Sequence, residues 1–177
     1  MVIDMAIEPL LRILHSPLNP NEAEGSWQDA EATLRTKLPN DFKEFIRAYG
    51  TGTISNFLSV LNPFSTRPTF NLIEQSRVQI DALRELRDDF GETIPFELYP
   101  SKGGLLPAAI SDNGDVVYWL ANGDPSEWTI VVNESRSPDY QEFKCDLTTY
   151  ITELLDGSQK THAFPDIFPG KANFMVV

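Results

Sequence analysis

The sequence is poor in the residues on which most catalytic and metal sites depend. Cys145 is its only cysteine, so no internal disulfide can form and the chain needs no oxidising compartment. Its two histidines, His15 and His162, lie near opposite ends of the chain, without the spacing of a metal motif such as H-E-x-x-H. Asp146 follows Cys145, and an adjacent carboxylate raises the pKa of a thiol instead of activating it. We therefore predict no catalytic residue, no metal site and no cofactor.

Glycine-rich phosphate loops and nucleophile elbows are also missing. The stretch GTGTIS at residues 50–55 resembles a phosphate loop only superficially, because it follows a predicted helix and lacks a third glycine. No Gly-x-Ser-x-Gly pattern occurs. A hydrolase that uses paired carboxylates stays open as an alternative, since a chain with 26 acidic residues always contains some close pair.

No hydrophobic run approaches the roughly 20 apolar residues that cross a bilayer. Near the start of the chain, Asp4 and Glu8 stand where a secretory signal carries Lys or Arg, and the apolar residues come at helical spacing. These features predict a cytoplasmic protein that does not contact membranes.

Basic residues are scarce, with 14 Lys and Arg against 26 Asp and Glu, which gives a formal net charge of −12. Such an excess repels phosphate backbones and anionic lipid headgroups, so we expect no direct nucleic-acid or membrane ligand. It attracts a basic partner instead, although solubility alone is the other explanation. Residues 112–156 hold ten acids and two bases, a net charge of −8, so about a quarter of the chain supplies two thirds of the excess.

Most of these acids fall in predicted turns or at the ends of predicted elements. If two successive hairpins open toward the same side, their carboxylates share a rim on which a basic protein could dock. Aromatic residues such as Trp128 or Tyr140 could anchor such a partner, although we expect Trp119 and Trp128 in the core. The predicted partner-binding residues are Asp112, Asp115, Asp124, Glu127, Asp139 and Glu142.

Apolar residues form 41% of the chain and charged residues 23%, which is typical of one globular domain. Hydrophobic spacing predicts helices near residues 3–14, 27–38, 39–50, 71–90 and 146–157. Residues 54–61 fit a strand, and residues 94–132 fit an antiparallel meander of about four strands. Residues 158–177 contain two Phe-Pro pairs, so we expect an extended arm that buries Phe164, Ile167, Phe168 and Phe174 on a domain formed by residues 1–157.

The pair Asn113-Gly114 lies between two apolar stretches and predicts a hairpin with a type I′ turn, which needs positive φ at both central residues. In this prediction Asp112 and Asp115 close the turn, and the spacing of a calcium loop is absent. The following VVYWL is apolar on both alternate faces, which indicates a central strand.

Several motifs occur in a characteristic order. Trp27 is followed by LPNDFKEFIRAYGTG at residues 38–52, by LLPAAISDNGDVVYWLANGDPSEWTIVV at 105–132 and by YITELLDG at 150–157. Their order over residues 23–157 resembles the SUKH superfamily, which contains bacterial immunity proteins related to the yeast cell-wall assembly regulators. The matched framework positions are Trp27, Leu38, Pro39, Gly50, Asn113, Gly114, Trp119 and Trp128.

The resemblance implies a single-domain α+β fold, with an antiparallel sheet of about four to six strands and helices packed against it. It also implies a protein without enzymatic activity that binds and neutralises a cognate polymorphic toxin, often a nuclease. A regulatory interaction module like the eukaryotic relatives is the alternative. The resemblance transfers no toxin-contacting residue, and the sequence is compatible with a monomer or a weak dimer.

Overall fold

The computed structural model describes residues 7–177, so Ile3, which we expected on the first helix, lies outside the described part. The helices are α1 (Glu8–Ile13), α2 (Trp27–Leu34), α3 (Asn40–Tyr49), α4 (Leu72–Asp88) and α5 (Leu147–Asp156), with a short 3₁₀ turn η1 (Pro125–Glu127). The strands are β1 (Gly52–Ile54), β2 (Leu58–Val60), β3 (Glu97–Leu98), β4 (Gly104–Ser111), β5 (Val116–Ala121), β6 (Thr129–Asn133), β7 (Tyr140–Phe143) and β8 (Phe174–Val176).

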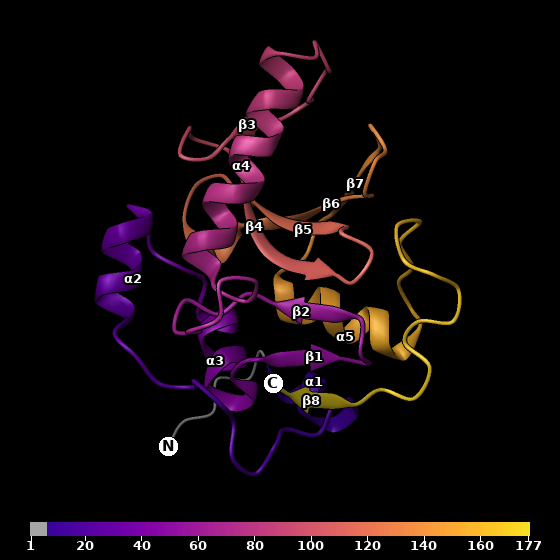
Figure 1. Ribbon diagram of the computed structural model, residues 1–177. Coiled ribbons are helices and arrows are strands. Elements are labelled where there is room, and N and C mark those ends of the chain that lie inside the picture. Colours follow the sequence, from indigo (N-terminus) through magenta and orange to yellow (C-terminus); the bar gives the residue numbers. More distant parts are fainter. Residues whose placement is uncertain (1–6) are drawn as a thin grey trace.

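The strands form one sheet in the order β7-β6-β5-β4-β2-β1-β8, and neighbours in this order are antiparallel (Figure 1). The α+β prediction is therefore confirmed, although the sheet has more strands than the expected four to six. The additional strands are only two to four residues long, too short for alternation to reveal them. One of them, β3, pairs with β4 in parallel and does not belong to the antiparallel meander that we predicted there.

Residues 54–61 are a hairpin of β1 and β2, and the prediction of one strand there is wrong. Ser55 and Asn56 adopt φ angles of 50° and 52°, and Phe57 N–H donates to Ile54 O at 3.0 Å. Two consecutive positive φ angles reverse the chain in the manner of a type I′ turn. The apolar residues on both sides had concealed this turn in the sequence.

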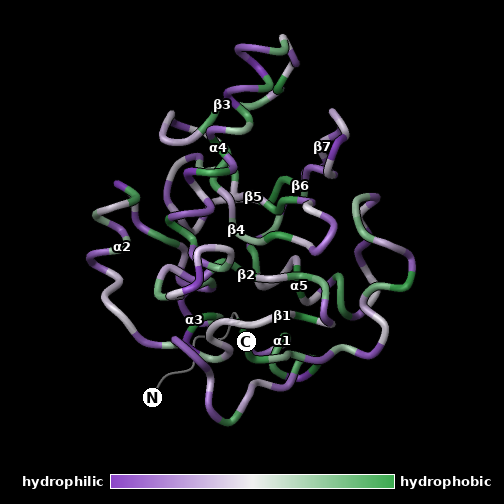
Figure 2. The backbone as a smooth tube through the Cα atoms, viewed as in Figure 1, coloured by the Kyte–Doolittle hydropathy of each residue, from purple (hydrophilic) through white to green (hydrophobic). Residues whose placement is uncertain are grey.

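The sheet is covered on both faces, which explains why β5 is apolar throughout. Val117 and Trp119 point into a core formed with α1, α3 and α5. Val116 and Tyr118 point into a second core, to which α4 and β3 contribute. Figure 2 shows hydrophobic residues on these central strands, whereas α2 and β7 are largely hydrophilic. The prediction that β5 is a central strand is confirmed.

Helix α4 lies over β4 on the second face, and its buried residues are Leu72, Ser76, Ile80 and Leu83. Asn71 caps it by accepting hydrogen bonds from Ile73 N and Glu74 N. The helix ends at Asp88, two residues before the predicted limit, and Phe90 beyond it is 69% exposed.

Helix α5 has the limits that its sequence predicts. Asp146 accepts a hydrogen bond from Thr149 N at 2.7 Å, and Gly157 ends the helix in the left-handed conformation with φ 80°. Beyond Gly157 the chain runs along the domain surface. Phe164 and Phe168 each lie 5.2 Å from the ring of Phe57.

The last strand, β8, adds Phe174 to the edge of β1, and this ring also contacts Tyr49 at 5.1 Å. Ile167 is 85% exposed, so the expectation that it is buried was wrong. It lies at the rim of a shallow recess of about 200 Å³ beside Phe57 and Phe168, and the domain does not close over it.

A row of aromatic rings joins the motifs that carry the family resemblance. Trp27 contacts Phe42 at 5.8 Å, Phe42 contacts Trp119 at 4.9 Å, and Trp119 contacts Trp128 at 6.0 Å between ring centroids. These four residues come from α2, α3, β5 and the end of η1. The row therefore attaches α2 and α3 to the centre of the sheet.

The Asn113-Gly114 hairpin forms, but its turn is not type I′. Only Gly114 has positive φ, at 87°, and Ser111 N–H bonds to Asp115 O across a three-residue loop. This is a turn followed by a glycine bulge, in which Ser111 and Asp115 close the loop. Ser111 Oγ accepts from Asn113 N and Asp115 N and donates to Asp115 Oδ2 at 2.6 Å, and these bonds favour the longer loop.

Gly50 lies where α3 meets the loop that follows α1. It has φ 67° and ψ −144°, and Thr51 N donates to Asn21 O at 2.8 Å. A Cβ at this position would lie 2.0 Å from Asn21 O. Both the backbone conformation and the close approach therefore require glycine.

We expect Gly50→Ala to lower the free energy of unfolding by about 3 kcal/mol or more, because it adds a clash with backbone to a conformation that only glycine adopts easily. Gly91→Ala is the matched control, since Gly91 has φ 70° with no atom within 4 Å of the added Cβ. The control should lose only about 1–2 kcal/mol. Urea unfolding of both variants measures the difference, and equal losses would contradict the role of the Asn21 contact.

Candidate functional site

The structure divides the predicted acidic rim between two ends of the sheet. Asp112 precedes β5 and Asp124 follows it, so the two turns lie at opposite ends of this strand. Asp139, at the start of β7, lies at the same end as Asp112, and Glu127 lies beside Asp124. A single rim shared by both hairpins does not form. Glu142 is exposed in the middle of β7, an edge strand.

Asp115 is not available to a partner, because it is only 2% exposed. Its carboxylate accepts hydrogen bonds from Ser111 Oγ and from Ser135 N at 2.9 Å, which joins the β4–β5 loop to the β6–β7 loop. The prediction that Asp115 contacts a partner is therefore wrong. The alternation of residues along β5 could not indicate that Asp115 is buried, because Asp115 lies one residue before this strand.

Asp124 and Glu127 are exposed and form a capping box around η1. The Asp124 carboxylate accepts from Ser126 N at 2.9 Å, and Asp124 N donates to Glu127 Oε2 at 3.2 Å. These bonds use only one oxygen of each carboxylate. The hydrogen bonds from Ser126 lower the pKa of Asp124, so this carboxylate stays charged in its turn.

The ion pairs of the protein are distributed unevenly. Among residues 7–177, all seven ion pairs join residues between Glu8 and Asp88. Within residues 7–177, none of the ten acids of residues 112–156 takes part in an ion pair, although residues 112–156 also contain two bases. The carboxylates of β5 to α5 therefore leave their charge uncompensated by short-range partners.

A recess of about 210 Å³ opens beside Asp124, and we call it the tryptophan hollow. The turn that contains η1 forms one wall, and the first residues of α3 and α5 form the other. Trp119 lies at its base, 1% exposed, and its Nε1 has no hydrogen-bond acceptor among the described residues. The lining residues are Pro39, Asn40, Asp41, Trp119, Pro125, Ser126, Trp128, Asp146 and Leu147.

Two carboxylates face the tryptophan hollow without a cation. Asp41 is 8% exposed and accepts a hydrogen bond from Thr148 N at 3.0 Å. Burial raises the pKa of Asp41, the bond from Thr148 opposes this rise, and the nearby charge of Asp146 adds to it. Neither acid forms an ion pair within residues 7–177. A cationic group in the hollow would offset the cost of burying the charge of Asp41 and the repulsion between Asp41 and Asp146.

In the sequence, Asp41 and Asp146 each stand near the start of a predicted helix, where a carboxylate is favourable. Asp41 lies in the first turn of α3 and Asp146 caps α5, and the fold also brings both to one recess. The sequence contained one signal that Asp41 is buried. Asp41 directly precedes Phe42, and a carboxylate next to a buried aromatic residue can itself become buried.

A second recess of about 220 Å³ continues from the tryptophan hollow and shares Asn40, Pro125 and Ser126 with it. Lys37 and Lys43 line it, and both bond to the buried carboxylate of Glu31. Burial raises the pKa of Glu31, but the two lysines and Leu38 N outweigh burial and lower it to about 2. The lysines are therefore engaged by Glu31 and leave the acids of the tryptophan hollow unpaired.

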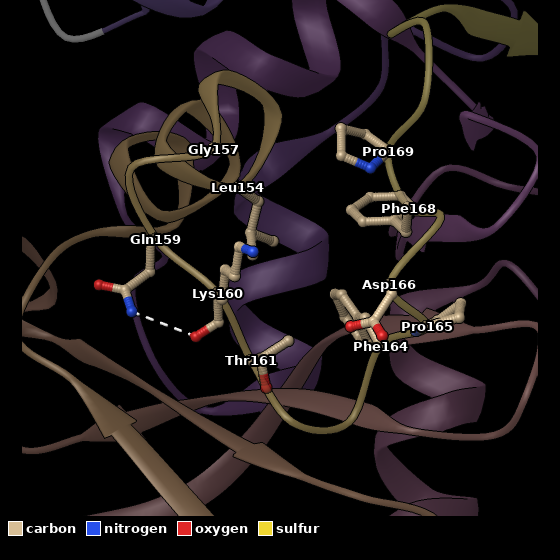
Figure 3. Close-up of a pocket in the computed structure, with 10 residues that line it drawn as sticks. All are labelled: Leu154, Gly157, Gln159, Lys160, Thr161, Phe164, Pro165, Asp166, Phe168 and Pro169. Atoms are coloured by element: carbon tan, nitrogen blue, oxygen red, sulfur yellow. Dashed lines mark hydrogen bonds between the residues drawn. The ribbon is translucent and has the colours of Figure 1, made fainter.

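A third recess, of about 180 Å³, lies between the end of α5 and the C-terminal segment (Figure 3). Leu154 and Gly157 stand on one side of it, and Phe164, Phe168 and Pro169 stand on the other. It is smaller than the roughly 300 Å³ at which small-molecule sites begin. Its only charged lining residues, Lys160 and Asp166, have opposite signs and show no bond between them.

Cys145 has the properties of an unreactive thiol. Burial raises its pKa to about 11, and the charges of Glu153 and Asp146 contribute to the rise. His15 and His162 are both exposed. Within residues 7–177, no three His, Cys, Asp or Glu side chains are grouped to hold a metal ion. In the same residues, no helix has both the length and the hydrophobicity of a membrane span.

The fold and the recesses define a single-sheet α+β protein in which none of the ten acids of residues 112–156 has an ion-pair partner among the described residues. The sequence model of the family SUKH_6, described as SMI1-KNR4 cell-wall, matches residues 24–151. The chain therefore belongs to this family and to the SUKH superfamily. Searches of curated proteins and of solved structures found no significant match.

We expect Asp41→Asn to stabilise the protein at neutral pH, because the folded state raises the pKa of this carboxyl. Stability falls as pH rises from the unfolded pKa, near 3.9, to the raised folded pKa, and the full cost is present above it. Asparagine keeps an acceptor for Thr148 N. Urea midpoints at pH 7 and at pH 3 should show a higher midpoint for the variant at pH 7 only. A variant less stable than wild type at pH 7 would contradict the cost of this charge.

We expect Cys145 to react with iodoacetamide at pH 8 at least about 100-fold more slowly than free cysteine, because its pKa of about 11 leaves little thiolate. The urea-unfolded chain is the control and should react at an ordinary rate. A folded-state rate close to that of free cysteine would show an activated thiol.

Proposed function

We propose that this chain is an immunity protein, which binds a cognate polymorphic toxin in the cytoplasm and neutralises it by occluding its active site. We further propose that the toxin is a basic protein, a nuclease. Membership of the SUKH superfamily supports a role in protein binding. The observation that carries the proposal is the absence of ion pairs from the ten acids of residues 112–156 within the described chain.

The physical argument rests on charge complementarity. A nuclease groove is basic because it binds the negatively charged phosphates of nucleic acid. Unpaired carboxylates on a sheet imitate the negative charge of those phosphates. Surface acids already held by Lys or Arg would lose those partners on binding, whereas the acids near β5 to α5 lose none. Long-range attraction then accelerates encounter, and salt screens it.

The tryptophan hollow supports docking at the end of the sheet that carries Asp124 and Glu127. Asp124 lies in the adjoining recess, which also contains Lys37 and Lys43. Asp41 and Asp146 line the hollow itself and have no ion-pair partner among the described residues. A lysine or arginine side chain of the toxin fits this chemistry, because aromatic walls cover its stem and carboxylates bind its head group. Anchors of this kind dominate many interfaces.

The alternative function is regulatory, as the family description points to cell-wall proteins. In that case the same acidic surface would bind several cellular proteins and not one toxin. Gene neighbourhood separates the two readings, because an immunity gene adjoins a gene whose product ends in a toxin domain.

Co-expression with the C-terminal domain encoded by the adjacent gene tests the proposal. We expect growth rescue, a purified complex, and an association rate that falls at least about 10-fold between low and molar salt. Toxicity without rescue, together with no complex, would overturn the immunity function.

Three matched pairs of substitutions locate the contact. Asp124→Asn with Glu127→Gln should weaken binding most, and both replacements keep acceptors for the capping box. Asp112→Asn with Asp139→Asn removes the same charge at the opposite end. Glu24→Gln with Glu85→Gln, two exposed acids without ion pairs, is the control for net charge. Equal effects of all three pairs would leave the hollow without a special role.

A further inference from the structure

A groove of about 290 Å³ lies between α2 and α4, which run side by side in Figure 1. Arg35, Arg77 and Arg84 line it, so three of the eight arginines of an acidic chain meet at one place. Asp81 is the only acid among the lining residues, which leaves a formal charge of +2 there. The groove thus has the opposite sign to the surface of residues 112–156.

The spacing of residues on α4 explains how the groove is built. Ile73, Arg77, Ile80 and Arg84 recur at steps of three and four and therefore share one helical face. The two isoleucines form an apolar floor, and the arginines rise beside it. Tyr99 and Pro100 close the far side, and Arg84 Nη2 donates to Tyr99 O at 3.5 Å.

Ser76 provides an independent sign of a missing ligand. It lies on the same helix face, lines the groove and is only 5% exposed. Its Oγ has no hydrogen-bond partner among the described residues. A buried hydroxyl without a partner is costly, and a ligand acceptor in the groove would satisfy it.

Arg35 reaches the groove from the end of α2 in an unfavourable conformation. Its φ is 58° at a helix C-cap, where glycine is usual, and no ion pair holds its guanidinium within the described chain. The other two arginines pair with exposed acids, Arg77 with Glu74 at 3.6 Å and Arg84 with Asp81 at 3.0 Å. Such exposed pairs are weak and leave most guanidinium donors free.

We propose that this groove binds the phosphate group of a phosphate monoester. Three guanidinium forks match the oxygens of a doubly charged oxyanion, and Ser76 Oγ donates a further hydrogen bond. The apolar floor of Ile73 and Ile80 accommodates a small substituent. A volume of about 290 Å³ suits one phosphate group with few attached atoms. The proposal is independent of toxin binding, because the groove shares no residue with the tryptophan hollow.

Titration of the ¹⁵N-labelled full chain with methyl phosphate tests the proposal, with acetate as the second arm and NaCl holding the ionic strength constant. We expect saturable shifts of the Ser76 and Arg77 amides, and at least 10-fold tighter binding of methyl phosphate than of acetate. Non-saturable shifts, or equal affinity for acetate, would overturn the phosphate site.

Four single variants complete the test. Arg77→Gln and Arg84→Gln should each weaken methyl phosphate binding at least 10-fold, and Ser76→Ala should weaken it several-fold without a change of charge. Arg87→Gln is the matched control, because Arg87 lies on the same helix outside the groove and pairs with Asp88. If Arg87→Gln weakens binding as much as Arg84→Gln, general charge and not the groove holds the anion. Urea midpoints show that the variants remain folded.

Discussion

The aromatic row from Trp27 to Trp128 is the contact on which the rest of this structure depends. Phe42 and Trp119 are almost fully buried and meet edge to face. This contact fixes where α3 packs against β5. Trp27 extends the row to α2, and Trp128 extends it to the turn after β5. Because Trp119 and Trp128 also line the tryptophan hollow, the recess has the rigidity of the core.

The same row joins the separate motifs that carry the family resemblance. Trp27, Phe42, Trp119 and Trp128 each lie in or beside one of these motifs. Gly50 is constrained as well, since its position after α3 is fixed by the approach of Asn21. Surface residues face no such requirement and are free to follow a partner.

Local patterns predicted the parts of the fold that local forces determine. α3 and α5 follow from apolar spacing and a terminal glycine, with Asp146 as the cap of α5, and both were found as expected. The strands β7 and β8 were missed, because YQEF is polar and FMV is too short to alternate. The turn at Asn113 differed in type because Ser111 and Asp115 bond across it, which dipeptide preferences do not include.

The candidate site was less predictable, since it depends on topology. A list of acids shows charge, but only strand order shows that Asp112 and Asp124 lie at opposite ends of β5. Asp41 and Asp146 are far apart in sequence and each has a sufficient local explanation at a helix start. Their common recess exists only because α3 and α5 pack side by side.

The C-terminal strand has a consequence for handling the molecule. β8 pairs with β1, where Ser55 N donates to Asn173 O and Val177 N donates to Thr51 O. β8 is the edge strand of the sheet, so loss of these few residues would move the open edge from β8 to β1 and leave Ser55 N and Thr51 O without their backbone partners.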